Sequence, residues 1–398
     1  MKKDISLSAI IAGLIAVIIS YAGPLVIVFQ AAKAAHLSNA QLSSWIWAIS
    51  IGSGVTGILL SLRYRTPVIN AWSTPGAALL VTSLAGVSYP EAVGAFLFSA
   101  GLIALLGWSG LFGRIVQHIP KSIAAAMLAG ILFRFGVDVF ASVRQQPLLI
   151  ITMLAGYLAF KRMTPRYAIL CVLLLGMILA AATGQIRFGD VPISLAIPVP
   201  TWPQFSWRAI ISVGVPLCIV TLTGQYVPGI AVLRAAGYQV PADPLVTVTG
   251  LGSILLAPFG SHALNLAAIT AAICTGREAH EESGKRYVAG VACGVFYILV
   301  GSFGTTLAAL FSVLPKELIA AIAGLALFGA IMNGLATAMA DEKQRESALI
   351  TFLVTASNVS FLGLGAAFWG LAVGILASVA LDNRLALKPL EFLRRKAG

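Results

Sequence analysis

Two short segments, residues 67–78 and 258–268, combine prolines, glycines and small hydroxyl side chains within an otherwise apolar chain. In each, an extended stretch precedes an apolar run that is too short to cross a bilayer alone. A helix beginning there would point unpaired backbone N–H groups, equivalent to about half a positive charge, into the membrane. The segments therefore predict an anion site that needs no basic side chain. Its candidate residues are Trp72, Ser73, Thr74, Gly76, Ser261, His262 and Asn265.

A purely structural interpretation of these residues stays open. Serine and threonine are common helix N-caps, and proline is common in the first helical turn. Ser73, Thr74 and Ser261 would then only cap helices, and the prolines would only bend them. A binding site is favoured because the two segments occupy corresponding places in the two halves of the chain, which is typical of the interrupted helices at transporter sites.

Two further interruptions have the same character: Tyr21-Ala-Gly23-Pro24 and Gln225-Tyr226-Val-Pro228. We expect them to form the other walls of the site, with Tyr21, Gly23, Gln225 and Tyr226 close to the ligand. The alternative is that their glycine and prolines only serve helix packing within the membrane.

His262 is the histidine that falls near the predicted midplane of the bilayer. Histidine titrates near neutral pH, so His262 is the candidate for carrying a coupling proton. Two alternatives stay open. The ring could be a hydrogen-bonded structural group, or the proton could cross without resting on any side chain.

Several other chemistries lack their residues. No Asp or Glu falls in the predicted spans that hold the four interrupted segments, which argues against a cationic substrate or a sodium site. A GxxxxGK[ST] loop, a Ser/His/Asp set and an HExxH motif are also missing. We therefore expect neither an ATP-driven pump nor an enzyme, and we expect no metal and no cofactor.

The elements that position these segments are membrane spans. Of the 398 residues, 59% are hydrophobic and 10% are charged, against roughly a quarter charged in soluble domains. Apolar runs of about 17–25 residues predict fourteen spans. Their limits are 5–31, 41–62, 70–86, 90–113, 119–142, 146–161, 166–185, 207–232, 243–257, 260–275, 285–311, 315–337, 345–359 and 361–382.

The basic residues predict the orientation. The net charge is +12, but Lys and Arg are scattered between the apolar runs, so we expect no nucleic-acid partner. Most of them fall in cytoplasmic loops if the amino terminus is inside, as the positive-inside rule requires. We therefore predict a multi-pass protein surrounded by membrane lipids, with both termini in the cytoplasm.

The chain also resembles itself. Residues 119–130, Ile-Pro-Lys-Ser-Ile-Ala-Ala-Ala-Met-Leu-Ala-Gly, match residues 314–324, Leu-Pro-Lys-Glu-Leu-Ile-Ala-Ala-Ile-Ala-Gly. Seven spans per half is an odd number, so the second copy would enter the membrane from the opposite side. Inverted repeats of this kind are typical of secondary transporters. The alternative is a chance likeness between Ala- and Gly-rich helices.

Residues 70–79 and 265–280, together with nearly the whole chain, resemble the bacterial benzoate:proton symporter family. That family is similar to the uracil-permease-like transporters. The resemblance implies an all-α polytopic protein of the bacterial inner membrane, with fourteen spans in seven-plus-seven inverted repeats and short strands before the half helices of spans 3 and 10. The implied division is a core domain at 1–117 and 207–312, a gate domain at 118–186 and 313–384, an extracytoplasmic linker at 187–206 and a basic tail at 385–398.

The function implied is proton-coupled import of an aromatic carboxylate such as benzoate, with a homodimer as a possible assembly. Nucleobase carriers of the wider superfamily hold their ligand with carboxylates in spans 8 and 10, where this chain has Gln225 and residues 262–265. This departure argues against a nucleobase. The alternatives are a transporter of another small anion or of a nucleobase, and an anion channel.

Overall fold

The structure, a computed structural model, describes residues 4–84, 86–114, 120–165, 167–186, 193–359, 361–362 and 364–381. It is a mostly helical polytopic membrane protein. Seven helices in the described part of the chain are long and apolar enough to cross a bilayer. An eighth span results if the pair Ser283–Ser302 and Gly304–Ser312, bent by 66°, counts as one. The seven are Leu7–Ala34, Asn39–Tyr64, Tyr89–Trp108, Lys121–Arg144, Trp207–Ala235, Ala242–Phe259 and Lys316–Ala338.

In the described part of the first half, the chain forms eight α-helices and one strand. These are α1 (Leu7–Ala22), α2 (Pro24–Ala34), α3 (Asn39–Tyr64), β1 (Asn70–Trp72), α4 (Thr74–Ser83), α5 (Tyr89–Trp108), α7 (Lys121–Ala141), α8 (Pro147–Met163) and α9 (Ala168–Ala182). A 3₁₀ turn, η2 (Ser142–Arg144), follows α7.

The second half has the same mixture of long and short elements. These are α10 (Trp207–Ala209), α11 (Val215–Thr221), α12 (Val227–Ala235), α13 (Ala242–Leu256), β2 (Leu264–Leu266), α14 (Ile269–Thr275), α15 (Tyr287–Ser302), α16 (Gly304–Ser312), α17 (Lys316–Ala338), α18 (Arg345–Ala356) and α19 (Ala366–Leu381). Between them lie two π-helical turns, η4 (Ile210–Gly214) and η5 (Leu222–Tyr226), and two 3₁₀ turns, η6 (Ala257–Phe259) and η7 (Ser283–Lys285).

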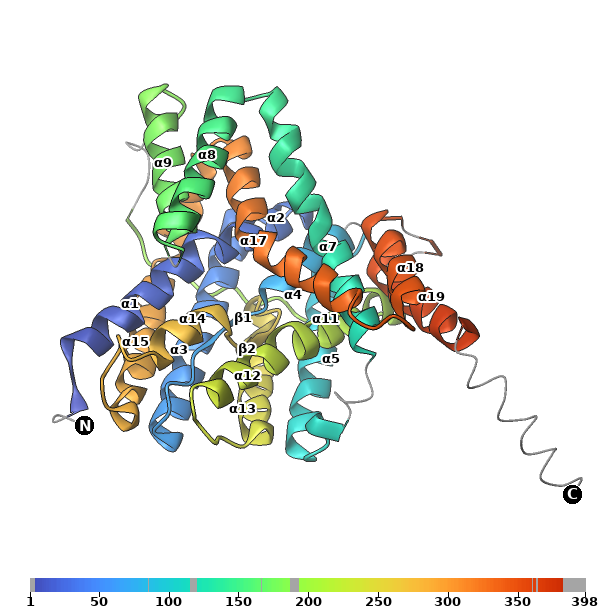
Figure 1. The fold of residues 1–398 in the computed structure, drawn as a ribbon, viewed down its shortest axis with the longest axis horizontal. Helices are drawn as coiled ribbons and strands as arrows, with labels where there is room; N and C mark the ends of the chain where they lie inside the picture. Colours follow the sequence, from blue (N-terminus) through green and yellow to red (C-terminus); the bar gives the residue numbers. More distant parts are fainter. Residues whose placement is uncertain are drawn as a thin grey trace, which may run out of the picture.

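The two predicted short strands are present and pair with each other near the centre of the molecule (Figure 1). β1 and β2 are antiparallel, with Ala71 opposite Asn265. Each is followed by a short helix, α4 after β1 and α14 after β2. Lipid cannot form hydrogen bonds with backbone N–H and C=O groups, so extended segments lie at membrane depth only where protein surrounds them. Pairing of β1 with β2 satisfies part of these backbone groups. Their residues are accordingly buried, with Ala71 intermediate.

The other two predicted interruptions are also present. α1 ends at Ala22 and α2 starts at Pro24, which occupies the first helical turn where its missing N–H is not needed. In the second half, η5 widens the helix just before Pro228. Such π-turns are frequent at functional sites because they expose backbone groups and redirect side chains.

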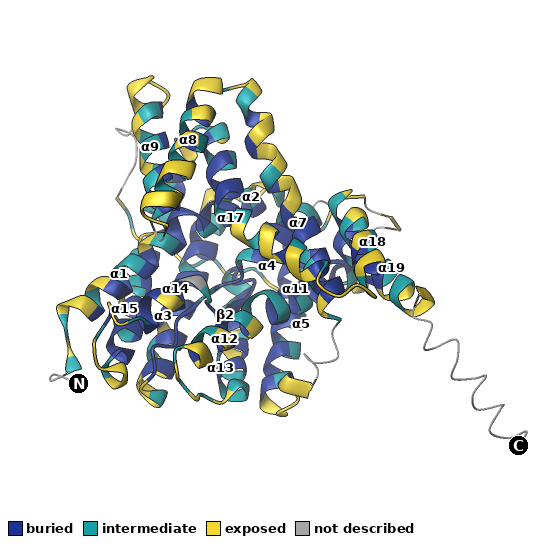
Figure 2. Cartoon of the chain, in the orientation of Figure 1, coloured by how far each residue is buried: buried dark blue, intermediate teal, exposed yellow. Residues whose placement is uncertain are grey.

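Small residues let the helices approach closely. A Cβ on Gly54 of α3 would lie 2.5 Å from the carbonyl oxygen of Gly294, and one on Gly294 of α15 would lie 2.6 Å from that of Gly54. Any larger side chain would push α3 and α15 apart. The outside of the molecule carries the exposed residues, many of them large and apolar (Figure 2). Such an exterior suits a lipid solvent.

Candidate functional site

A cavity of about 630 Å³ lies beside the paired strands. Its wall combines residues from α1, α2, both strand–helix segments and η5 with residues from α7, α8, α9 and α17. Most of the lining is apolar. The polar lining residues among those described are Ser20, Trp72, Thr74, Lys121, Tyr157, Lys161, Thr223, Gln225, Thr270, Asn333 and Thr337.

Three predicted site residues line this cavity directly: Trp72, Thr74 and Gln225. Trp72 ends β1, Thr74 begins α4 and Gln225 lies in η5. The indole N–H of Trp72 is buried and has no hydrogen-bond partner among the described residues. The cavity therefore combines an apolar ring surface with a hydroxyl and an amide.

Two predicted aromatic residues lie behind the lining. The Tyr21 ring meets the Trp72 ring edge to face, with centroids 5.5 Å apart, and its hydroxyl donates to Ser50 Oγ at 2.5 Å. The Tyr226 hydroxyl donates to the carbonyl oxygen of Leu264 at 3.0 Å. Tyr21 therefore supports the ring that faces the cavity, whereas Tyr226 ties η5 to β2.

Ser73 connects the two halves of the site. Its Oγ accepts from the backbone N–H of Gly76 at 3.0 Å, which caps α4, and from the hydroxyl of Thr221 at 3.1 Å. Its backbone N–H donates to the carbonyl oxygen of Ala263 at 3.1 Å. A glycine at position 76 keeps this cap close, because a Cβ there would lie 2.7 Å from Ser73 Oγ. Ser73 thus acts as the predicted N-cap and also holds the second half.

Two predicted residues of the second segment contact Ser73 and not the cavity. His262 Nε2 lies 3.0 Å from the carbonyl oxygen of Ser73, and His262 Nδ1 accepts from Trp45 Nε1 at 3.1 Å. In the amide orientation that gives both its oxygen and its nitrogen a partner, the Asn265 oxygen accepts from the Ser73 N–H at 3.0 Å and its nitrogen donates to the Leu266 carbonyl oxygen at 3.3 Å. Both side chains are almost fully buried.

Two further predicted residues have other surroundings. Gly23 lies at the break between α1 and α2, where a Cβ would lie 2.9 Å from the Cβ of Ala326 on α17. Ser261 is buried, and its hydroxyl has no partner among the described residues. Gly23 therefore permits a close approach to α17, and Ser261 has no visible role in the cavity.

Sequence reasoning missed the lining from α7, α8 and α17, including Lys121, Lys161 and Asn333. One signal for Lys121 was present, because it lies in the repeated Pro-Lys motif. Lys161 and Asn333 carried no such signal. Among the lining residues that the structure describes there are two lysines and no Asp or Glu. The electrostatic potential of this cavity therefore favours an anion.

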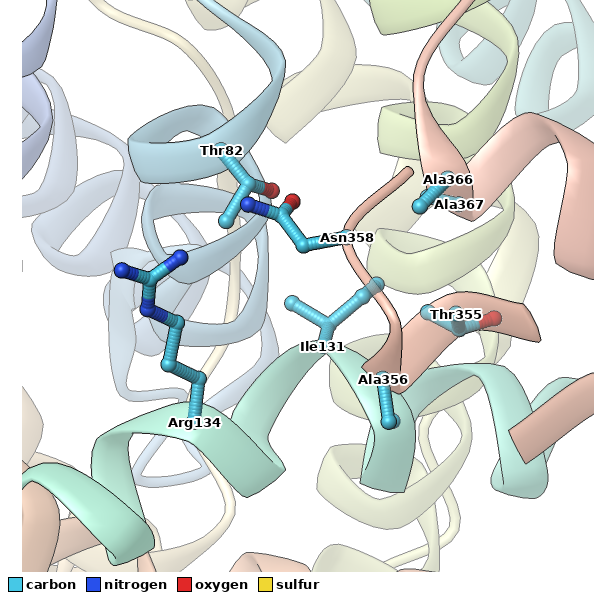
Figure 3. Close-up of a pocket in the computed structure, with 9 residues that line it drawn as sticks. Thr82, Ile131, Arg134, Thr355, Ala356, Asn358, Ala366 and Ala367 are labelled. Atoms are coloured by element: carbon cyan, nitrogen blue, oxygen red, sulfur yellow. The ribbon is translucent and has the colours of Figure 1, made fainter. Parts of the chain in front are cut away.

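A second, much smaller pocket lies between α4, α7 and the loop that joins α18 to α19 (Figure 3). Thr82, Arg134 and Asn358 line it, and its volume is about 10 Å³. That is room for about one water molecule. It is too small for an organic substrate, so the large cavity is the candidate site.

Paired interrupted segments beside a cavity are typical of membrane transport proteins. Residues 3–380 match the benzoate membrane transport protein family, BenE. The chain belongs to this family. It is 48% identical to the benzoate membrane transport protein of Acinetobacter baylyi over 95% of this chain and 96% of that protein. It is 44% identical to the inner membrane protein YdcO of Escherichia coli over 94% of this chain and 95% of that protein.

Solved structures of other transporters share the fold. The transmembrane domain of the cyanobacterial bicarbonate transporter BicA matches with a TM-score of 0.59 at 14% identity, covering 94% of this chain and 96% of that chain. SLC26A9 matches with a TM-score of 0.63 at 14% identity, covering 94% of this chain and 65% of that chain. At this identity the likeness concerns the fold alone.

Proposed function

We propose that this protein is a secondary active transporter that imports an aromatic carboxylate, such as benzoate, together with protons across the bacterial inner membrane. Membership of the benzoate membrane transport protein family supports the substrate class. The observation that carries the proposal is the chemistry of the cavity wall. It is mainly apolar, it has hydroxyl and amide groups at the interrupted segments, and its described charged residues are two lysines.

The cavity suits a small aromatic acid in size and composition. Ligand pockets typically measure about 300–1,000 Å³ and hold few polar groups. The ring would lie between Trp72 and the apolar residues of α7, such as Leu128. The carboxylate would accept hydrogen bonds from Thr74, Gln225 and Thr270, which all line the same cavity. Tyr21 would hold the Trp72 ring from behind.

We propose fourteen spans in two inverted repeats of seven for the transport cycle. Two correspondences support this arrangement. The strand–helix pair β1 and α4 corresponds to β2 and α14. Helix α7 corresponds to α17, and both helices begin directly after a proline. Residues 1–117 and 207–312 would form a core domain, and residues 118–186 and 313–384 a gate domain. The cavity is lined by both, so a movement of one against the other would provide alternating access.

Two paths are proposed for the coupling proton. His262 carrying the proton stays a prediction, and its two hydrogen bonds would both have to accommodate the added charge. In the alternative, the proton crosses with the substrate carboxylate. We place both termini in the cytoplasm, because the basic residues are concentrated in the loops of that side.

The function is tested with purified protein in liposomes. We expect radiolabelled benzoate to accumulate above its external concentration when only an inward proton gradient is supplied. Unlabelled aromatic acids should compete, whereas uracil and inorganic anions should not. Flux without accumulation would indicate an anion channel, and competition by uracil or chloride would indicate another substrate.

The site is tested by a matched pair of neighbours, Gln225→Ala and Tyr226→Phe. Gln225 lines the cavity, so its loss should raise KM for benzoate about tenfold, the effect of one hydrogen bond to a charged group. Tyr226 bonds Leu264, so its variant should lower thermal stability and leave KM unchanged. The reverse pattern would place the substrate elsewhere.

A further inference from the structure

The ring of His262 is enclosed by α3, by α5 and by the junction between β1 and α4. Its relative exposure is 1%, and it is absent from the described lining of the cavity. Trp45 of α3 donates its indole N–H to Nδ1 at 3.1 Å. On the opposite side of the ring, Nε2 lies 3.0 Å from the carbonyl oxygen of Ser73, between β1 and α4.

These two partners determine where the ring proton lies. An indole N–H is only a donor, so Nδ1 must be the acceptor and carries no proton. A carbonyl oxygen only accepts, so Nε2 must carry the proton. The neutral ring therefore satisfies both bonds. A second proton on Nδ1 would face the Trp45 N–H with no acceptor, and such an unpaired buried donor is unfavourable.

In the described part of the chain, the groups against the His262 ring are aromatic rings and hydrogen-bonding groups, and none is a carboxylate that would balance a positive charge. The rings of Trp45 and Phe96 meet the His262 ring at 69° and 67°, with centroids 5.6 and 6.4 Å away. A titratable side chain, Tyr89 of α5, contacts Trp45 on the side of these rings, with the two ring centroids 6.3 Å apart. Among the residues that the structure describes, no Asp or Glu contacts the His262 ring.

The bond to Ser73 reaches the cavity. The Ser73 carbonyl oxygen also accepts from the N–H of Ala77 at 2.7 Å, which is a first-turn bond of α4. His262 therefore holds the same carbonyl that begins the helix, one residue before Thr74 on the cavity wall. Replacing the ring would remove one of the two hydrogen bonds to this carbonyl and loosen the first turn that presents Thr74.

We propose that His262 is a positioning residue, kept neutral with its proton on Nε2, which fixes the first turn of α4 while the coupling proton crosses elsewhere. The transport part of this inference rests on the proposed function. The protonation part does not, because it concerns the resting protein alone.

The protonation part is tested by NMR of the purified full chain labelled with ¹⁵N-histidine, with the His262 signals identified by their loss in His262→Gln. We expect a protonated Nε2 and an unprotonated Nδ1 at every pH from about 5 to 8, since the ordinary titration of histidine falls in this range. Protonation of Nδ1 within that range would overturn the proposal. Trp45→Phe, which keeps the histidine and removes the donor to Nδ1, should allow the ring to titrate.

The transport part is tested in liposomes with His262→Gln and His262→Ala. Gln keeps an N–H donor for Ser73, so it should raise KM for benzoate less than Ala, which we expect to raise it about tenfold. Gln should also keep proton-driven accumulation and the pH profile of the unmodified protein. Exchange of benzoate without proton-driven accumulation in His262→Gln would show that His262 carries the proton. If neither variant folds, the shift of the Nδ1 signal in Trp45→Phe identifies His262, and the NMR measurement on the unmodified chain still decides the protonation state.

Discussion

The two strand–helix segments at the centre of the molecule use their polar side chains differently. In the first, Ser73 caps its own helix through the N–H of Gly76, and Pro75 lies in the first turn of α4. In the second, the N-cap residue of α14 is Ala268, and no side chain caps the helix. Its polar residues come earlier, and His262 and Asn265 both contact Ser73.

This difference shows that two similar segments can have different roles in one site. The first segment is stabilised within itself and also receives hydrogen bonds from the second. The second has a shorter helix and directs its polar groups across the strand pair. The position of Ser73 therefore depends on residues about 190 positions later in the chain, which links the two halves at the cavity.

The largest effect is expected from Ser73→Ala. This change removes the cap of α4 and the acceptor of the Thr221 hydroxyl. Loss of a serine cap typically costs about 1 kcal/mol. We expect a lower melting temperature and a KM for benzoate raised by about tenfold, measured by thermal unfolding and by uptake into liposomes.

Ser261→Ala is the matched control, because its hydroxyl is equally buried and has no described partner. It should leave both measurements unchanged. An equal loss in the two variants would break the comparison between the segments and would mean that Ser261 has a partner in the transport cycle.

A smaller effect is expected from the two lysines that begin α7 and α17, Lys121 and Lys316. Lys121 lines the cavity and Lys316 does not, although each starts a helix after a proline. Lys121→Gln should raise KM about threefold at low salt, and the effect should shrink as salt screens the charge. Lys316→Gln should leave KM unchanged. Equal effects would mean that net charge, not position in the cavity, attracts the substrate.

The smallest effect is expected outside both segments. The Tyr287 hydroxyl donates to Asp4 at 2.7 Å, and this bond lowers the pKa of Asp4 below its ordinary value of 3.8. A lowered pKa contributes stability above the unfolded-state pKa, and this contribution is lost as the pH falls through the folded-state pKa. Tyr287→Phe should therefore lower the melting temperature slightly at neutral pH and make no difference below about pH 3. Benzoate uptake should be unaffected, and a changed KM would link this contact to the cavity.

Much of the framework was predictable from local signals. Proline and glycine mark the breaks at Pro24, Pro75 and Pro228, because proline suits a first helical turn. The two strands were predictable from the family resemblance of residues 70–79 and 265–280. The cap at Ser73 follows from the preference of serine for that position.

The direction of each side chain was not predictable in the same way. Among the candidates, Trp72, Thr74 and Gln225 line the cavity, whereas Ser73, His262 and Asn265 hold the two segments together. Ser73 and Thr74 are neighbours in the chain, but of the two only Thr74 lines the cavity, whereas Ser73 meets partners that the register of β1 against β2 places beside it. No local pattern specifies that register between segments so distant in the chain.

By itself the sequence determined that this protein is a membrane protein and where its helices are interrupted, because these properties depend on composition and on residues close together in the chain. Only the tertiary structure decided which polar groups face the cavity and which ones pair with each other. The bonds from Trp45 to His262 and from His262 to Ser73 join residues 217 and 189 positions apart. Such contacts exist only after the helices have packed.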